Sequence, residues 1–417
     1  MASVRIEGPA TLQGEVAVRG AKNAALPVLM AAATGCEPVI LENVPTDMMD
    51  VRTEVEAMRH IGLQITAEDG RLEVGAADAA TTSLPAELSG RLRYSLLFLG
   101  LLVGKYGRAK ITMPGGCDLG DRRYDLHLEG LRRLGADVRV SEGTIEASAD
   151  KLLGTDIDFY LPTTTGTENV MLAACFAEGR TRIFNANTRP EVADMAACLN
   201  AMGGKVSVRN RVVEIEGGRR LTGCRHTVMR GWDEAFLYIL AAGMTGGEIC
   251  VKDFCLEHIL SDVAYLRQAG MDVFEWGGNV YVSARGKHLQ AFDLFTAPYP
   301  GVNSDMQPLF AAFASQCDGE STVTDQRFTE RFQYVAELQK LRMSIEAYGN
   351  CAVIRGPTRL RGAPVTALDL RCGAALVIAA LAAEGTTTID DGYQIDRGYE
   401  RIASRLSALG AQIDRLE

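Results

Sequence analysis

Residues 170–183 read VMLAACFAEGRTRI, an apolar helical run that stops at Ala177-Glu178-Gly179 and leads into the β-rich segment Thr181-Arg182-Ile183. A second, amphipathic helix then ends at Gly203, because glycine readily adopts the left-handed conformation that closes a helix. Val206-Ser207-Val208 follows with the alternation of a strand. This stretch therefore predicts helix, strand, helix and strand in that order.

The same order recurs six times along the chain, at a spacing of about 70 residues, longer than the roughly 20–50 residues of solenoid repeats. The first helix of each copy stops at residues 31–35, 101–104, 177–179, 244–247, 316–319 and 383–385. The second helix ends at Gly62, Gly135, Gly203, Gly270 and Gly410, and at Leu341-Arg342-Met343 in the fifth copy. Each copy has one helix that is apolar nearly all round and one with a polar face.

We therefore predict an α/β protein with two barrel-like domains, each built from three βαβαββ repeats. Residues 22–229 form the first domain, and residues 1–21 with 230–417 form the second. The chain crosses between them near Arg19-Gly20-Ala21 and Met229-Arg230-Gly231. A cleft between two such domains is the expected place for a ligand.

The amino-acid composition argues against several classes of binding partner. The formal net charge of −10 argues against a non-specific nucleic-acid binder, since phosphate-backbone affinity needs clustered Lys and Arg. Ten scattered Cys fit a reduced, cytoplasmic protein. The most apolar stretches, such as 94–104 and 373–383, are shorter than the ~20 residues that cross a bilayer. We expect neither a membrane nor a nucleic-acid partner.

Standard cofactor motifs are absent from the sequence. It has no phosphate-binding P-loop, no dinucleotide-binding glycine motif and no Cys-x-x-Cys pair, and its five His lack metal-ligand spacing. We expect no cofactor and no metal.

One cysteine stands in an unusual setting. Cys117 lies in the Pro-opened, Gly-rich segment 113–120, between a predicted strand and helix, and Arg122-Arg123 follow within one helical turn. Neighbouring cations lower the pKa of a thiol from about 8.5 and make it reactive. Cys117 is thus either a reactive thiol or a structural residue of a loop.

Charged residues open three of the apolar helices. Lys22-Asn23 begin the first, where the helix dipole disfavours a cation unless an anion such as phosphate binds there. The fifth copy begins with Ser304-Asp305 and the sixth with Asp369-Leu370-Arg371. Asp305 is either a helix cap or a candidate base, and Arg397, before the last helix, is either a surface charge or an anion clamp.

Eight segments share their sequence with one known family: GAKNAALP (20–27), PGGC (114–117), DLH (125–127), GA (135–136), SDMQ (304–307), RF (327–328 and 331–332), DLR (369–371) and IDRGYER (395–401). In these the whole chain resembles the UDP-N-acetylglucosamine 1-carboxyvinyltransferases, relatives of the shikimate-3-phosphate carboxyvinyltransferases. The resemblance implies the enolpyruvyl transferase fold of two inverted α/β domains. It also implies transfer of the enolpyruvyl group of phosphoenolpyruvate to the 3-hydroxyl of UDP-N-acetylglucosamine, at the start of peptidoglycan synthesis.

The resemblance also implies roles for single residues. Cys117 would be the proton donor and Asp305 the base near the acceptor hydroxyl. The cations around phosphoenolpyruvate would be Lys22, Arg122, Arg371 and Arg397. The acceptor-binding positions would be Asn23, Arg93, Asp125, His127, Thr164, Thr165, Gly166, Asp305 and Phe328. Lys and Arg suit a substrate that carries a phosphate and a carboxylate.

Three departures from the family pattern concern the acceptor. Residues 162–169 read PTTTGTEN where the family has PSVGATEN, so that β-branched Thr165 replaces a glycine. Tyr94 stands where the family has a small alanine, and MRGWDE (229–234) replaces PDRIE. A smaller uridine nucleotide such as UMP, as used in nucleoside-antibiotic pathways, therefore stays open as acceptor. A catalytically silent homologue that only binds a nucleotide sugar is the alternative of another class.

Overall fold

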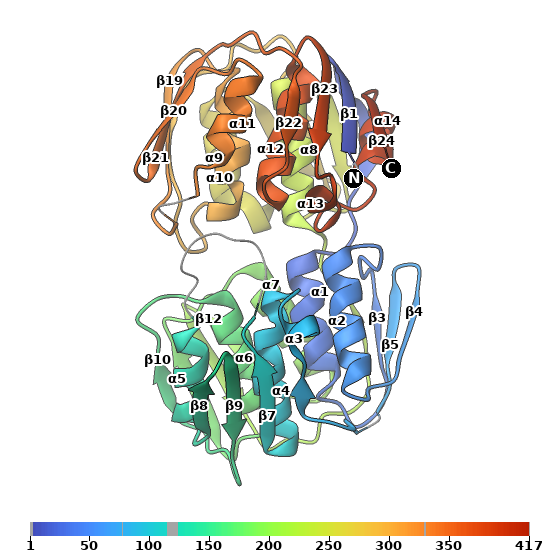
Figure 1. Cartoon of the computed structure of the whole chain (residues 1–417), viewed down its shortest axis with the longest axis vertical. Coiled ribbons are helices and arrows are strands. Elements are labelled where there is room, and N and C mark those ends of the chain that lie inside the picture. Colours follow the sequence, from blue (N-terminus) through green and yellow to red (C-terminus); the bar gives the residue numbers. More distant parts are fainter. Residues whose placement is uncertain (1–2, 77, 115–123, 329–330, 417) are drawn as a thin grey trace. The chain divides into compact units, whose positions relative to one another are not determined.

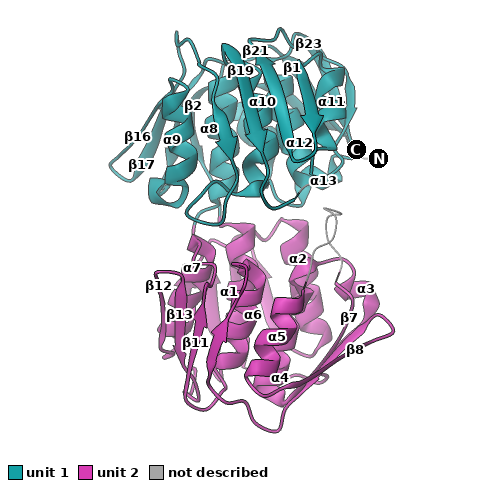
Figure 2. Ribbon diagram, turned by 90° about the vertical axis from the view of Figure 1, so that its left-hand side faces the viewer, with its two compact units in different colours: residues 1–19, 117–121, 230–417 teal, residues 20–116, 122–229 magenta. Residues whose placement is uncertain are grey.

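The computed structural model describes residues 3–76, 78–114, 124–328 and 331–416. These form two compact units, drawn in teal and magenta in Figure 2. Unit 1 includes Met1–Arg19 and Arg230–Glu417, and unit 2 includes Gly20–Gly116 and Arg122–Met229. No helix of the described residues has both the length and the apolar character needed to cross a membrane.

Unit 2 consists of three successive copies of one motif (Figure 1). The first comprises α1 (Lys22–Ala32), β3 (Val39–Glu42), α2 (Met49–His60), β4 (Ile65–Glu68) and β5 (Arg71–Val74). The second comprises β6 (Ser83–Leu84), α3 (Ala86–Ser89), the 3-10 turn η1 (Arg93–Leu96), α4 (Leu97–Tyr106), β7 (Arg108–Thr112), α5 (Asp125–Arg133), β8 (Asp137–Ser141) and β9 (Thr144–Ser148). The third comprises β10 (Asp156–Asp158), α6 (Thr164–Ala174), β11 (Arg180–Phe184), α7 (Pro190–Ala201), β12 (Val206–Arg209) and β13 (Val212–Glu216).

Unit 1 repeats the motif three more times. Its first copy comprises α8 (Trp232–Met244), β15 (Glu248–Lys252), η2 (Leu256–Ile259), α9 (Leu260–Gln268), β16 (Asp272–Trp276) and β17 (Asn279–Ser283). The second comprises β18 (Asp293–Phe295), η3 (Ser304–Met306), α10 (Gln307–Ala314), β19 (Gly319–Thr324), α11 (Tyr334–Lys340), β20 (Ile345–Tyr348) and β21 (Cys351–Gly356). The third comprises β22 (Pro364–Thr366), α12 (Leu370–Ala382), β23 (Gly385–Asp390), α13 (Tyr393–Asp396), α14 (Ile402–Ala408) and β24 (Gln412–Leu416).

Every copy in the described residues builds a four-stranded sheet with one parallel and two antiparallel pairings, such as β10-β11-β13-β12. Strands distant in sequence complete three of these sheets. β14 (Arg225–Thr227), near the end of unit 2, pairs with β3 of its first copy. In unit 1, β2 (Gln13–Ala17) pairs with β15, and β1 (Ser3–Gly8) lies between β23 and β24. The two N-terminal strands thus complete two of the three sheets of unit 1.

The apolar helix of each copy is buried. The three apolar helices of a unit contact one another: α1, α4 and α6 in unit 2, and α8, α10 and α12 in unit 1. Close contact is possible where glycines face a neighbouring helix. A Cβ atom at Gly100 of α4 would overlap the backbone carbonyl of Asn169 of α6. The side-chain oxygen of Asn169 instead accepts a hydrogen bond from the Gly100 N–H at 2.8 Å.

The second helices end as the sequence predicts. Gly62, with φ of 104°, and Gly410, with φ of 99°, follow α2 and α14 in the left-handed conformation. In the fifth copy Arg342 takes this conformation, with φ of 66°, at some cost in backbone energy. The repeated sheets confirm the predicted α/β fold of βαβαββ units.

Candidate active site

Several of the candidate residues from the sequence lie at the starts of buried helices. Each such helix, or the 3-10 turn that leads into it, opens with a pair of residues: Lys22-Asn23, Arg93-Tyr94, Thr164-Thr165, Trp232-Asp233, Ser304-Asp305 and Leu370-Arg371. Helix starts carry unpaired N–H groups and a partial positive charge. A repeated fold therefore places these polar side chains in equivalent positions within each unit.

In unit 1 the helix starts share one network of ion pairs. Arg371 is 2% exposed, and its Nη2 donates to Asp233 Oδ2 at 2.7 Å and to Asp305 Oδ2 at 3.2 Å. Its Nη1 donates to the hydroxyl of Tyr399 at 2.8 Å. Arg331 Nη1 donates to the other oxygen of Asp305 at 2.8 Å. The Asp305 carboxylate is thus held between two guanidinium groups.

The neighbours of Arg371 keep it charged. Burial acts to lower the pKa of its guanidinium, but Tyr399, Asp233 and Asp305 outweigh burial and raise this pKa well above its ordinary value. Burial also raises the pKa of the Tyr399 hydroxyl, so this group stays protonated. Asp369 caps α12 by accepting the Arg371 backbone N–H at 2.6 Å.

Asp305 does not cap its own helix. The side chain of Asn303 does so, by accepting the Asp305 backbone N–H at 3.0 Å. The Asp305 carboxylate keeps about a quarter of its surface exposed while it contacts Arg331 and Arg371. The capping role therefore belongs to Asn303, and Asp305 takes part in the ion pairs instead.

Two further candidates lie in unit 1. Arg397 follows α13 and donates from Nη1 to the side-chain oxygen of Gln394 at 3.1 Å. The guanidinium groups of Arg327 and Arg331 contact the ring of Phe328, with their centres 5.2 and 5.6 Å from its centroid. This contact orients Arg331, which holds Asp305.

In unit 2, Lys22 is buried and pairs with Asp50 of α2 at 2.9 Å, so the cation at the start of α1 is neutralised by an acid. The hydroxyl of Tyr94 donates to the backbone carbonyl of Asn23 at 3.3 Å. Tyr94 therefore fixes the start of α1 from the start of the neighbouring repeat, since η1 leads directly into α4.

His127 and Thr165, two of the candidates for acceptor binding, contact each other. The Nε2 atom of His127 lies 3.0 Å from the Thr165 hydroxyl, and its Nδ1 atom has no partner in the described part of the chain. Burial, aided by Arg93, lowers the pKa of His127 to about 3, so the imidazole is neutral at pH 7. Thr163 caps α6 by accepting the Gly166 N–H at 3.3 Å, which places Thr164 and Thr165 in the first helical turn.

Three sequence candidates remain: Asp125, Cys117 and Arg122. Asp125, at the start of α5, accepts a hydrogen bond from the Tyr160 hydroxyl at 2.6 Å. Cys117 and Arg122 lie outside the described residues. No group of three or more His, Cys, Asp or Glu side chains suited to a metal occurs in the part of the chain that is described.

Sequence reasoning missed several residues of these networks. Asp233 occupies the same helix position as Asp305, so repeat symmetry could have identified it. Tyr399 lay inside a recognised segment without an assigned role. Glu54 of α2 and Glu168 of α6 are fully buried, and their carboxyl oxygens have no partners among the described residues. Burial raises the pKa of both well above the ordinary value. Glu168 lies in the family segment 162–169, whereas no local sequence signal distinguishes Glu54.

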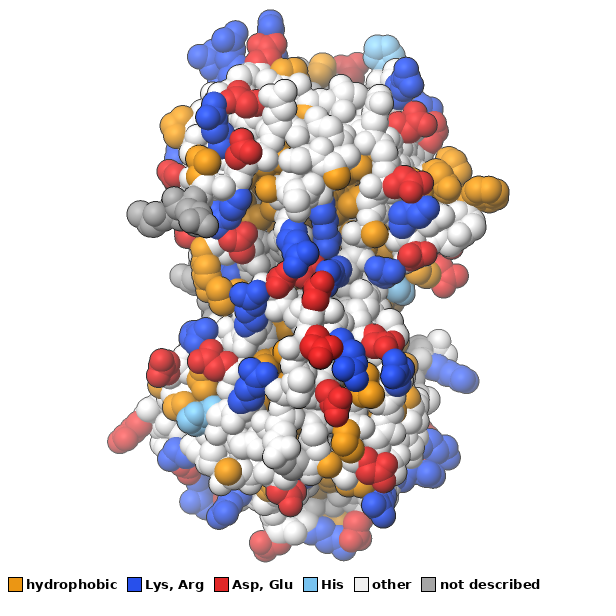
Figure 3. Space-filling view, turned by 90° about the vertical axis from the view of Figure 1, so that its right-hand side faces the viewer, with side chains coloured by type: hydrophobic (Ala, Val, Ile, Leu, Met, Phe, Trp, Pro, Cys, Tyr) orange, Lys and Arg blue, Asp and Glu red, His pale blue; other side chains and the backbone are white. Residues whose placement is uncertain are grey.

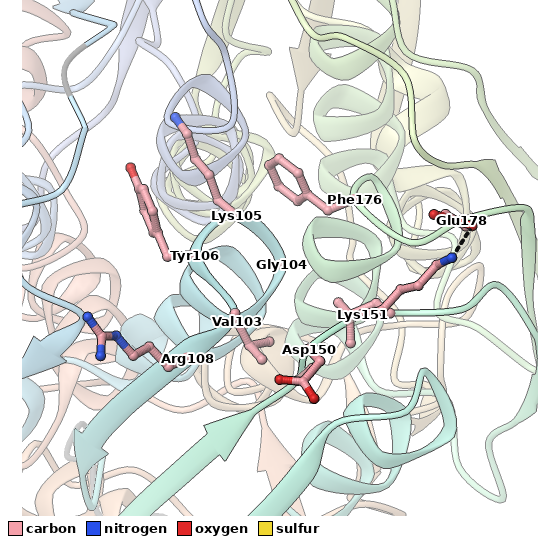
Figure 4. A pocket seen from close by; sticks show the side chains of 12 residues that line it. Val103, Gly104, Lys105, Tyr106, Arg108, Asp150, Lys151, Phe176 and Glu178 are labelled. Atoms are coloured by element: carbon pink, nitrogen blue, oxygen red, sulfur yellow. Dashed lines mark ion pairs between the residues drawn. The ribbon is translucent and has the colours of Figure 1, made fainter.

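A surface pocket in unit 2 lies at the opposite end of α4 from Arg93 (Figure 4). Lys105, Tyr106 and Phe176 line it, as do Lys151 and Glu178, which form an ion pair at 2.6 Å. None of the sequence candidates contributes to it. On the molecular face in Figure 3, positive and negative side chains are interspersed.

Comparison with known proteins agrees with the fold. Residues 6–406 match the family model for EPSP synthase (3-phosphoshikimate 1-carboxyvinyltransferase). Two solved structures share the fold over nearly all of both chains. The enolpyruvyl transferase NikO from Streptomyces tendae has a TM-score of 0.89 at 24% identity, covering 99% of this chain and 98% of its own. EPSP synthase from Acinetobacter baumannii has a TM-score of 0.80 at 18% identity, covering 100% of both.

Sequence relatives are more similar. The UDP-N-acetylglucosamine 1-carboxyvinyltransferase of Halorhodospira halophila is 41% identical over 418 residues, covering 100% of both chains. That of Sorangium cellulosum is 40% identical, covering 100% of this chain and 99% of its own. Because the identity extends over the full length, this chain belongs to the UDP-N-acetylglucosamine 1-carboxyvinyltransferase family of enolpyruvyl transferases.

Proposed function

We propose that the protein transfers the enolpyruvyl group of phosphoenolpyruvate to the 3-hydroxyl of UDP-N-acetylglucosamine and releases phosphate. The observation that carries this proposal is the Asp305 carboxylate, held by Arg331 and Arg371 at the start of a buried helix. It occurs in a chain 41% identical over its whole length to a protein named for this reaction. The reaction would be the first committed step of peptidoglycan synthesis.

The proposed donor site consists of cations. Lys22, Arg122, Arg371 and Arg397 would bind the phosphate and the carboxylate of phosphoenolpyruvate. The Nε atoms of Arg331 and Arg371 are buried and have no hydrogen-bond partner among the described residues. Because these atoms are closed to solvent, the two guanidinium groups would act on the substrate carboxylate through their positive charge.

The chemistry is an addition followed by an elimination. Cys117 would deliver a proton to the methylene carbon of phosphoenolpyruvate, while the acceptor oxygen bonds to the adjacent carbon and gives its proton to Asp305. Phosphate then leaves the resulting tetrahedral carbon with the proton taken from the acceptor, and the methyl group returns a proton to the Cys117 thiolate, which restores the vinyl group. A positioned acid and a positioned base are each typically worth about 10²–10⁴ in rate.

A smaller acceptor such as UMP is the second candidate, because of two contacts in unit 2. The Thr165 hydroxyl engages His127 Nε2, one of the groups expected to bind the acceptor. Tyr94 places an aromatic side chain beside Asn23, another such residue. Both side chains are larger than those of the family pattern, so they reduce the space and the donors available to a nucleotide sugar.

Phosphate release from phosphoenolpyruvate tests the proposal. The purified protein is offered UDP-N-acetylglucosamine, UMP or shikimate 3-phosphate, with Asp305→Asn as the matched control. We expect release with UDP-N-acetylglucosamine and a loss of release in the variant. Release with UMP alone would select the smaller acceptor. No release with any acceptor would refute the proposal and favour a silent binding homologue.

A further inference from the structure

Asp233 belongs to the Asp305 network, although neither the sequence motifs nor the proposed mechanism assigns it a role. We propose that Asp233 is a positioning residue: by taking a share of the positive charge of Arg371, it keeps Asp305 able to accept a proton. The inference rests on the proposed function of Asp305 as the base. It concerns the charge balance around that base.

The geometry shows that the two acids compete for one nitrogen atom. Arg371 Nη2 lies 2.7 Å from Asp233 Oδ2 and 3.2 Å from Asp305 Oδ2, so the shorter bond goes to Asp233. Asp233 is 3% exposed and Arg371 is 2% exposed, so water screens this pair little. The second Asp233 oxygen accepts the Glu234 backbone N–H at 3.0 Å. Its position is therefore fixed on both sides.

The balance of charges around Arg371 explains how Asp233 would affect the basicity of Asp305. Two guanidinium groups, of Arg331 and Arg371, face two carboxylates, of Asp233 and Asp305. Without Asp233, Asp305 alone would neutralise both cations. A carboxylate near uncompensated positive charge binds a proton more weakly, by about 1–3 pKa units for a close pair. Asp233 thus limits how strongly the arginines suppress the basicity of Asp305.

Other charged or titratable groups surround this network. Tyr399 donates to neither acid but contacts Arg371, and Asp369 caps α12 beside it. Asp325 accepts from Ser304 and from the backbone of Arg327 and Phe328. On the α8 side, Glu234 pairs with Arg405, which also pairs with Glu400. In the described residues these groups have their own partners, so none of them replaces Asp233 at Arg371.

Repeat symmetry supports the inference independently. Asp233, Asp305 and Arg371 are the second residues of α8, η3 and α12, so the three repeats of unit 1 each contribute one member of the network.

The test compares Asp233→Asn with the wild type by the pH dependence of kcat at saturating substrates. We expect the acidic limb to move to lower pH by about one unit and the plateau to fall about tenfold. Asp233→Ser serves as a second neutral variant if the first fails to fold, and Asp233→Glu should restore the limb. Glu337→Gln removes a buried acid of α11 in the same unit and should leave the limb in place. An unshifted limb in a folded neutral variant would overturn the inference.

A second measurement separates this inference from the proposed function. The carboxyl carbon of Asp305 is followed by NMR in ¹³C-aspartate-labelled protein, with Asp305→Asn used to assign its signal. We expect its titration midpoint to be about one unit lower in Asp233→Asn than in the wild type. An equal midpoint would overturn the inference even if no acceptor supports turnover, whereas a lowered midpoint in an inactive protein would refute only the proposed reaction.

Discussion

Replacing Thr165 tests how much its contact with His127 contributes to the stability of the fold. Thr165→Val keeps the shape of the side chain but removes the hydroxyl 3.0 Å from His127 Nε2. The other ring nitrogen, Nδ1, has no partner among the residues that the structure describes, so the substitution would leave the buried imidazole without a hydrogen bond to any of them. An unsatisfied buried polar group costs about 1–3 kcal/mol. We therefore expect Thr165→Val to unfold at lower denaturant concentration than the wild type without substrate.

Thr165→Gly combined with Tyr94→Ala tests whether the bulk of these two side chains restricts the space for the acceptor. These changes free His127 Nε2 and remove the aromatic side chain that bonds to Asn23. A difference of about 1–3 kcal/mol in pocket contacts corresponds to roughly 10–200-fold in specificity. We expect kcat/KM for UDP-N-acetylglucosamine to rise within this range, relative to UMP measured in parallel.

Thr165→Val also serves as the control for the double variant. Thr165→Val keeps the bulk, so it should not improve the use of UDP-N-acetylglucosamine although it frees the same nitrogen from its hydroxyl partner. If the wild type already uses this acceptor efficiently and the double variant brings no gain, the departures do not restrict the acceptor. If Thr165→Val is as stable as the wild type, the hydroxyl contact contributes nothing to the fold.

Four further predictions concern single residues. Asp305→Asn should lower turnover about 10²-fold or more while substrate binding survives, as measured by steady-state kinetics and calorimetry; near-normal turnover would exclude a base at this position. Arg397→Ala should raise the KM for phosphoenolpyruvate, and an unchanged KM would remove it from the anion site. An epoxide phosphonate that mimics phosphoenolpyruvate should alkylate Cys117 alone, and Cys117→Asp should keep acid function but block alkylation; equal labelling of several Cys in peptide mapping would contradict this. Because burial raises the pKa of Glu54, this residue loses its proton first in the unfolded state as pH rises. Its contribution to stability therefore falls above about pH 4.5, by at most ~1.4 kcal/mol per pH unit. Glu54→Gln should match the wild type near pH 4.5 and exceed it at pH 8 in urea unfolding, and a constant difference across this range would argue against a protonated Glu54.

The sequence by itself determined the repeated architecture and part of the candidate site. Helix stops and their glycines are local signals, because the left-handed cap depends on one residue and the turn before it. Gly62 and Gly410 could therefore be assigned from the pattern alone. Asp305 and Arg371 were found because repeats place equivalent residues at equivalent helix starts. The family resemblance added roles that spacing does not give.

Only the tertiary structure decided which side chains meet. His127 and Thr165 are 38 residues apart, and Arg371 and Asp233 are 138 residues apart. Likewise, β1 joins β23 at the far end of the chain, with Val4 paired to Ile389. Such contacts depend on loop closure and packing over long sequence separations, which leave no local periodic signal. For the same reason the sequence named Asp305 as a candidate base, whereas the structure identified Asp233 as the acid that shares its arginine.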